Sequence, residues 1–218
     1  MNKVTIWAYC MHSLPFRLED CTHLITSARL NQLRRFRPDD QLRSLCGDLL
    51  VLKALSAHVP MVPSTPLQYA VSEHGKPFLP DFPNFHFNVS HSGNWVLCAA
   101  GDRSIGIDIQ QERPVKPSLF RVLSPQEQSF LNTLSASEQQ SSFFDLWCLK
   151  EAYCKATGLG LRIPLHSFTV SLHPTAVSDG TYRIKNILFS DQEYHVGLCV
   201  KGPDMPETEL RVVSYIKL

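Results

Sequence analysis

The sequence lacks several features that would place it in a common functional class. It has no apolar run near the length that spans a bilayer, and its first residues enter a strand-like segment without a signal region. Its charge is almost balanced, with 21 Lys and Arg residues against 20 Asp and Glu residues, so no overall field attracts nucleic acid or an anionic membrane. We therefore expect a cytoplasmic protein that binds neither membranes nor nucleic acid.

The motifs of several common binding sites are also missing. The seven cysteines are odd in number, lie mostly in apolar segments and include no Cys-x-x-Cys pair, which favours reduced thiols over a disulfide framework or a zinc site. There is neither a Gly-x-x-x-x-Gly-Lys-Ser/Thr loop nor a dinucleotide-binding glycine fingerprint, which argues against an ordinary kinase or dehydrogenase. Any phosphate site must therefore be local.

What the sequence does contain is one order of elements that occurs twice. With 218 residues and 44% hydrophobic content, the chain is long enough for one large domain or two small ones. In each half we predict a strand, a helix, a longer helix and further strands. The predicted ranges are 4–11, 26–36, 39–58, 67–78 and 95–100 in the first half, and 105–110, 124–134, 139–157, 167–172, 182–189 and 194–200 in the second. The repeat predicts two α+β halves, 1–102 and 103–218, with a ligand crevice at their junction.

Two helix ends carry clear signals. The segment Ser124-Pro125-Gln126-Glu127 combines a capping residue, a proline in the first turn and an acid near the third position, which is typical of a helix start. Gly158 and Gly160 follow the long helix of the second half and predict that it ends after Thr157.

A charged stripe beside a tryptophan is predicted on the helix over 139–157. Helical spacing gathers five residues onto it: Trp147, Lys150, Glu151, Cys154 and Lys155. Because a solvated helix seldom carries a large aromatic inside its charged face, the stripe predicts a partly buried cleft. One carboxylate between two lysines suits a metal and a phosphate. The alternative for Glu151 is a surface pair with Lys155, worth only about 0.2–0.5 kcal/mol.

A second acidic position lies in the strand over 105–110. Alternation places its three isoleucines on one face and Gly106, Asp108 and Gln110 on the other. The small Gly106 would let a ligand approach Asp108 closely. Asp108 facing Glu151 would form an oxygen site for Mg²⁺, which uses one or two protein carboxylates and completes its shell with water and phosphates. Taken alone, Asp108 has the alternative of a solvated acid near a strand end.

The motifs together resemble those of the 4′-phosphopantetheinyl transferases, and within them the surfactin-synthetase-activating branch. The two-part signature of the family is matched by Gly106-Ile107-Asp108 and by Trp147-Cys148-Leu149-Lys150-Glu151-Ala152 with Lys155. The upstream matches are Arg43-Ser44-Leu45-Cys46-Gly47-Asp48, Gly75-Lys76-Pro77 and Phe87-Asn88-Val89-Ser90-His91-Ser92-Gly93. Five blocks in the family order cover most of the chain, which is far more specific than any one motif.

The resemblance implies a fold and an activity. The fold would be two similar α+β halves related by a pseudo-twofold axis. The activity would be transfer of 4′-phosphopantetheine from coenzyme A to a serine of an acyl or peptidyl carrier protein, with release of 3′,5′-ADP. The implied enzyme is a monomer that uses Mg²⁺, with Mn²⁺ as an alternative ion, and its carrier serves fatty-acid, polyketide or nonribosomal-peptide synthesis.

The family motif also implies roles at the metal and the phosphates. Asp108 and Glu151 would bind the metal and act in catalysis together with Lys155. Lys155 and Lys150 would contact the coenzyme and stabilise developing charge. Many relatives carry a glutamate where this chain has Gln110, which brings an amide oxygen without charge and is therefore a weak ligand.

Upstream positions are implied in coenzyme binding. Arg43 would approach the 3′-phosphate, because a guanidinium binds oxyanions in a bidentate fork, and Lys76 would lie near the nucleotide. Ser90 and His91 would contact the phosphate or adenosine end. On spacing alone, Lys76 is also compatible with an ordinary turn lysine, and Arg43 with a surface charge.

Several alternatives stay open at this stage. Ser90 beside His91 suggests hydrolysis, but neighbours on a strand face opposite ways and the Gly-x-Ser-x-Gly elbow is absent. A Mg²⁺-dependent nucleotide pyrophosphatase would use water in place of a carrier. A coenzyme-binding or carrier-binding module would bind without turnover. For a transferase, the base that accepts the serine proton is either Glu151 or a metal-bound water.

Overall fold

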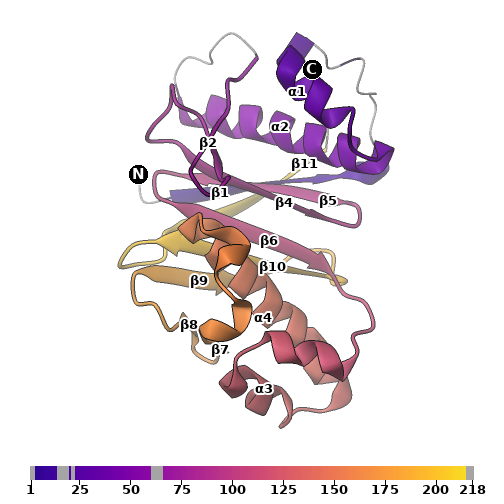
Figure 1. The fold of residues 1–218 in the computed structure, drawn as a ribbon, viewed down its shortest axis with the longest axis vertical. Coiled ribbons are helices and arrows are strands. Elements are labelled where there is room, and N and C mark those ends of the chain that lie inside the picture. Colours follow the sequence, from indigo (N-terminus) through magenta and orange to yellow (C-terminus); the bar gives the residue numbers. More distant parts are fainter. Residues whose placement is uncertain (1–2, 14–19, 21–22, 60–65, 215–218) are drawn as a thin grey trace.

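The computed structural model describes residues 3–13, 20, 23–59 and 66–214. The fold is mixed α+β, and its main elements stack in four layers (Figure 1): helices, a sheet, a second sheet, and helices again. The helices are α1 (Ser27–Leu33), α2 (Pro38–His58), α3 (Pro125–Leu131) and α4 (Ala136–Thr157). The main strands are β1 (Lys3–Cys10), β4 (His86–Ser92), β5 (Trp95–Gly101), β6 (Ile105–Gln111), β9 (Tyr182–Asn186), β10 (Tyr194–Lys201) and β11 (Glu207–Val213).

The two sheets divide along the chain with one exception. The first sheet has the order β11-β1-β5-β4 and the second the order β6-β10-β9. All pairs are antiparallel except β1 with β11, so the C-terminal strand returns to the sheet of the first half. Two short hairpins complete the strands: β2 (Ala70–Val71) with β3 (Pro77–Phe78), and β7 (Val170–Leu172) with β8 (Thr175–Val177).

Three apolar clusters hold the four layers together. The first lies between α1, α2 and the first sheet, the second between the two sheets, and the third between the second sheet and α3 with α4. The three isoleucines of β6 are all inaccessible and belong to the middle cluster, which confirms their predicted shared face. The opposite face of β6 is thereby turned toward α4, which lies on that sheet (Figure 1).

The predicted element ranges agree with the structure for both long helices and for most strands. Strands β4, β8 and β11 lie outside the predicted ranges, and the predicted strand over 67–78 is instead the β2–β3 hairpin. The hairpin turns at Gly75, whose φ of 86° belongs to the left-handed region that favours glycine. Among the described helices, none combines the length and the apolar character needed to cross a lipid bilayer.

The edge strands β4 and β6 are joined through side chains. Each bond runs from a β6 backbone N–H to a polar β4 side chain: Ile107 N to Asn88 Oδ1 (2.8 Å), Ile109 N to Ser90 Oγ (3.4 Å) and Gln111 N to Ser92 Oγ (3.0 Å). The even-numbered β4 residues therefore face β6, while Val89 and His91 border a cavity on the α2 side. We call this junction the seam, and it brings the two halves of the chain into direct contact.

Candidate active site at the seam

Helix α4 carries the second signature block, and both of its ends are specified locally. A capping box at Ser135 and Glu138 starts it, three residues before the predicted range. Gly158, in a left-handed conformation with φ of 78°, ends it as predicted.

Two glycines let α4 lie very close to its sheet. A Cβ atom on Gly106 of β6 would fall 2.0 Å from the carbonyl oxygen of Ala152, and one on Gly197 of β10 would fall 2.5 Å from the carbonyl group of Cys148. The predicted role of Gly106 is thereby corrected, because α4 and not a ligand fills the space beside it. Gly197 pairs with Asp108 in the sheet, so both glycines bring the helix onto this carboxylate.

Asp108, Lys155 and Ser90 form a tight cluster at the seam. The Asp108 side chain is almost fully buried, and its Oδ1 lies 2.6 Å from Lys155 Nζ. The Ser90 hydroxyl donates to the same Oδ1 at 2.8 Å and accepts a bond from Lys155 Nζ at 2.9 Å. Because it also accepts from the Ile109 N–H, this hydroxyl uses its full hydrogen-bonding capacity. Ser90 thus links the backbone of β6 to the ion pair of Asp108 and Lys155.

Glu151 lies beside this cluster without being tied to it. The side chain is partly buried, and no described residue donates a hydrogen bond to its carboxylate. Burial and the nearby charge of Asp108 raise the pKa of Glu151, against the opposing effect of Lys155. A carboxylate held near another carboxylate without donors of its own is suited to a cation or a proton.

The donor set at this point suits a hard cation. Asp108 and Glu151 offer carboxylate oxygens, and among the described residues there is no group of three or more His, Cys, Asp or Glu side chains that could hold a metal by itself. Two carboxylates are what Mg²⁺ commonly takes from a protein when phosphates and water supply the rest. Gln110 donates from its amide nitrogen to Asp108 Oδ2 at 3.4 Å, and its amide oxygen accepts from the Ser92 hydroxyl at 3.5 Å.

A cavity opens on the other side of the seam. It measures about 360 Å³ and lies between α2, β4 and the β2–β3 hairpin, with His91, Ser44, Asp48 and Tyr69 among its lining residues. Its polar wall includes an ion pair in which Arg29 Nε lies 2.8 Å from Asp48 Oδ2. The buried Tyr69 hydroxyl has no hydrogen-bond partner among the described residues. No sequence pattern points to Tyr69, whereas Asp48 ends the first upstream block.

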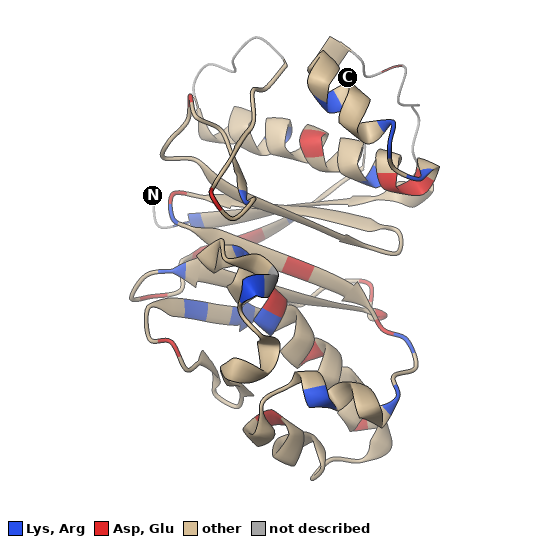
Figure 2. Cartoon of the chain, viewed as in Figure 1, with Lys and Arg blue, Asp and Glu red and all other residues tan. Residues whose placement is uncertain are grey.

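Basic groups gather between this cavity and the Asp108 cluster. Desolvation by neighbouring atoms and the positive charges of Arg43 and Lys155 lower the pKa of His91. Arg43 is held by the Gly93 carbonyl at 3.2 Å and by Asp40 at 3.0 Å. Figure 2 shows an acidic residue on β6 and charged residues of both signs on the part of α4 beside it.

Lys76 is brought to the same region but is engaged by the protein. Its ammonium group donates to Ile105 O at 2.9 Å, Ala156 O at 3.2 Å and Ser104 Oγ at 3.4 Å. Burial lowers the pKa of Lys76 to about 8. These bonds tie the hairpin of the first half to the start of β6 and the last turn of α4.

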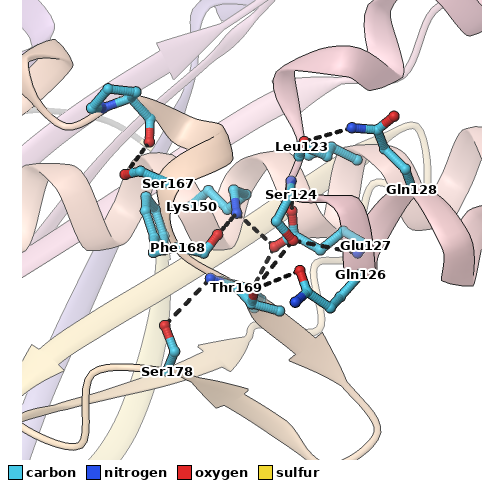
Figure 3. Close-up of polar contacts among 12 residues, drawn as sticks. Leu123, Ser124, Gln126, Glu127, Gln128, Lys150, Ser167, Phe168, Thr169 and Ser178 are labelled. Atoms are coloured by element: carbon cyan, nitrogen blue, oxygen red, sulfur yellow. Dashed lines mark hydrogen bonds and ion pairs between the residues drawn. The ribbon is translucent and has the colours of Figure 1, made fainter.

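Lys150 is the predicted site residue that the structure takes away from the site. It is fully buried, and its ammonium group lies 2.6 Å from Glu127 Oε1 and 2.6 Å from the Phe168 carbonyl oxygen (Figure 3). The predicted stripe is too wide: Lys150 and Cys154 face the third apolar cluster, and Trp147 packs against Phe143. Contact of Lys150 with coenzyme A does not fit this placement, because no part of the side chain reaches solvent.

Comparison with known proteins gives matches along most of the chain. Residues 104–199 match the model of the 4′-phosphopantetheinyl transferase superfamily, and residues 14–103 match that of the 4′-phosphopantetheinyl transferase N-terminal region. The 4′-phosphopantetheinyl transferase Sfp of Bacillus subtilis is 36% identical over 206 residues, which cover 89% of each chain. The transferase ffp of Bacillus subtilis is 34% identical over 88% of each chain, and HetI of a Nostoc species is 31% identical over 80% of this chain and 76% of its own.

Proposed function

The chain belongs to the 4′-phosphopantetheinyl transferase superfamily, and from this premise we propose that it moves the 4′-phosphopantetheine group of coenzyme A onto a serine of an acyl or peptidyl carrier protein. Membership makes it a transferase enzyme. The observation that supports the assignment of the site is the cluster of Asp108, Lys155 and Ser90, with Glu151 beside it and a cavity on the far side of the seam.

Coenzyme A would bind across the seam. Its nucleotide end would enter the cavity beside His91, with Arg43 near the 3′-phosphate and Ser90 near the pyrophosphate. Arg43 and His91 support this orientation of coenzyme A, because a guanidinium and an imidazole are suited to bind phosphate oxygens. Gly75 and Pro77 line the cavity on either side of Lys76, and Lys76 would bind the coenzyme only by exchanging its bonds to Ser104, Ile105 and Ala156 for bonds to a phosphate.

Asp108 and Glu151 would hold Mg²⁺ or Mn²⁺, which supplies neutralisation of the pyrophosphate charge when bound. Lys155 is fixed by Asp108 and by the Ile107 carbonyl at 3.1 Å, so its ammonium group is already oriented before the substrate arrives. A preoriented cation costs no reorganisation when negative charge develops on the leaving group. Lys155 would therefore stabilise the departing 3′,5′-ADP.

Glu151 would accept the proton of the carrier serine. The raised pKa makes this carboxylate a better base than an exposed glutamate, provided that it remains ionised. The serine oxygen would form a bond to the β-phosphorus, and the bond from that phosphorus to the oxygen of 3′,5′-ADP would break. No covalent intermediate with the protein is needed, because phosphoryl transfer depends chiefly on positioning and charge stabilisation.

The proposed architecture has one active site in a monomer. The two halves, 1–102 and 103–218, would be related by a pseudo-twofold axis. The same order of strand, helix and long helix in each half supports this, as do the two sheets packed face to face. Strand β11 is the element that crosses back between the halves.

Mass spectrometry of a panel of apo carrier proteins tests the function. Incubation with the protein, coenzyme A and Mg²⁺ should add one phosphopantetheine group to the carrier serine and release an equal amount of 3′,5′-ADP. Replacing the carrier serine by alanine is the matched control and should stop both. Release of 3′,5′-ADP from coenzyme A without any carrier would instead identify a pyrophosphatase, and binding without release would identify a module that does not turn over.

A further inference from the structure

A buried ion pair lies directly behind the proposed active site. Lys150 precedes Glu151 on α4, and its ammonium group is inaccessible to solvent, as is nearly all of Glu127 on α3. Besides Glu127 Oε1 and the Phe168 carbonyl, the ammonium group faces the Phe168 ring at 4.2 Å from its centroid (Figure 3). A lysine has three N–H donors, and each of these contacts offers it a partner.

The same carboxylate gathers two further segments. Glu127 Oε2 accepts from the Ser124 N–H at 2.7 Å, which completes the capping box of α3. Glu127 Oε1 also accepts from the Val170 N–H at 2.7 Å, at the start of β7. Helix α4, the start of α3 and the β7–β8 hairpin are therefore tied to a single side chain.

Stability alone is a poor explanation for such a pair. Replacing a buried ion pair by apolar residues of similar volume is often neutral or stabilising, whereas removing one partner leaves an uncompensated buried charge. What the pair supplies is a directional contact between α4 and α3, because its hydrogen bonds are satisfied in only one relative orientation of the two helices. Gly106, Gly197 and the apolar face of α4 hold the helix close to its sheet, and the pair adds hydrogen bonds with a defined direction to this packing.

We propose that Lys150 and Glu127 are positioning residues that set the rotation of α4, so that Glu151 and Lys155 face Asp108. A turn that moves Lys150 away from Glu127 also moves Glu151, the next residue, and Lys155, one helical turn further along. This inference rests on the proposed roles of Glu151 and Lys155. It assigns to Lys150 a function that needs no contact with coenzyme A.

Single and double replacements separate positioning from stability. Lys150→Met and Glu127→Gln each leave one buried group without its charged partner and should lower the melting temperature. The double variant contains no buried charge at this point and should recover the part of that loss that an unpaired buried charge causes. Its kcat for carrier modification should nevertheless stay about 10- to 100-fold below that of the wild-type protein, with a smaller change in KM for coenzyme A, because misplaced reacting groups slow the chemical step.

A matched control loses stability in the same cluster without touching the pair. Leu131→Ala removes a fully buried side chain of α3 and should lower the melting temperature while leaving kcat unchanged at temperatures where the variant is folded. A double variant with wild-type kcat would show that the pair is structural only and would overturn the inference. Absence of transfer by the wild-type protein would instead refute the proposed function.

If the double variant does not fold, Lys150→Gln provides a second test of the positioning role. Lys150→Gln keeps an amide donor for Glu127 and Phe168 but carries no charge, so its kcat should lie between those of Lys150→Met and the wild-type protein. Equal kcat values in all three proteins would overturn the inference, and the expected ranking would support it.

Discussion

The two long helices each cover one of the two sheets but are packed differently. Helix α2 has 21 residues and borders a cavity of about 360 Å³ on β4. Helix α4 has 22 residues and lies so close to β6 and β10 that two glycines are needed beneath it. The cavity beside α2 makes that side of the molecule suited to ligand binding. The close packing of α4 makes this helix suited to holding reacting groups in fixed positions.

Their charges differ in the same way. On α2, Arg43 is paired with Asp40, and Asp48 is paired with Arg29 of α1; both pairs are partly accessible, so a ligand is able to compete for them. On α4, Lys150 is fully enclosed, and Lys155 is held by three oxygen atoms at the seam. Rearrangement is therefore easier on the α2 side, and each prediction below tests this division.

The largest effect is expected from Glu151→Gln on α4. The variant keeps an oxygen ligand but removes charge and basicity, and kcat should fall by about 10²- to 10⁴-fold, the range for loss of a general base. Glu138→Gln, the same substitution at the exposed start of this helix, is the control. Steady-state kinetics of carrier modification supply the measurement, and full activity of Glu151→Gln at ordinary Mg²⁺ would refute the site assignment.

Asp108→Asn distinguishes the metal role from the base role in the same experiment. This variant should chiefly weaken metal binding, so its kcat should rise toward the wild-type value at saturating Mg²⁺. If Glu151→Gln also recovers under those conditions, a metal-bound water removes the proton. If Glu151→Gln stays inactive with metal and coenzyme A bound while Asp108→Asn recovers, Glu151 is the base.

A pair of glycine substitutions tests the packing difference itself. A Cβ on Gly106 would meet a backbone oxygen at 2.0 Å, so Gly106→Ala should cost about 3 kcal/mol or more and reduce activity. On α2, a Cβ on Gly47 would meet Val89 Cγ1 at 2.9 Å, and this side chain is able to move, so Gly47→Ala should cost about 1 kcal/mol. Urea unfolding measures both, and equal costs would contradict the comparison.

Coenzyme affinity should depend on the α2 side. Arg43→Ala and His91→Ala each remove one charged or polar contact and should weaken coenzyme A binding by about 1.5–3 kcal/mol, which is about 10- to 150-fold in KM, with less change in kcat. Arg37→Ala, an exposed arginine at the start of α2, is the control and should change neither constant. Unchanged affinity in both site variants would remove them from the coenzyme site.

The smallest effect is expected at His195, on β10 beside Asp145 of α4. Burial alone would lower the pKa of His195, but hydrogen bonds of 2.8 Å to Asp145 and to Glu112, together with their charges, raise it. The stabilisation is therefore fully present below the unfolded pKa of about 6.5 and is lost as pH rises through the higher folded value. His195→Gln should cost about 1 kcal/mol at pH 6 and less at pH 9, as measured by thermal unfolding. A constant cost across this range would rule out the charged pairing.

Much of the arrangement could be predicted from local patterns. Alternation predicted the buried face of β6, and capping signals predicted the start of α3 and the end of α4. Strand β4 was not predicted because Asn88, Ser90 and Ser92, which face β6, are polar. Their partners are backbone N–H groups of β6 and not an apolar core. Strand β11 was not predicted because its burial is incomplete along an edge.

The family motifs, the long helices and the two acidic residues proposed as metal ligands can all be identified from local sequence patterns. Which face of α4 meets the seam depends on how the helix packs on its sheet, because helical period defines a stripe without naming its partner. Glu127 illustrates the difference. Its spacing from Ser124 predicts a helix cap, and the structure confirms the cap. That the same carboxylate also binds Lys150, 23 positions away, follows from the packing of α3 against α4 and from no local pattern.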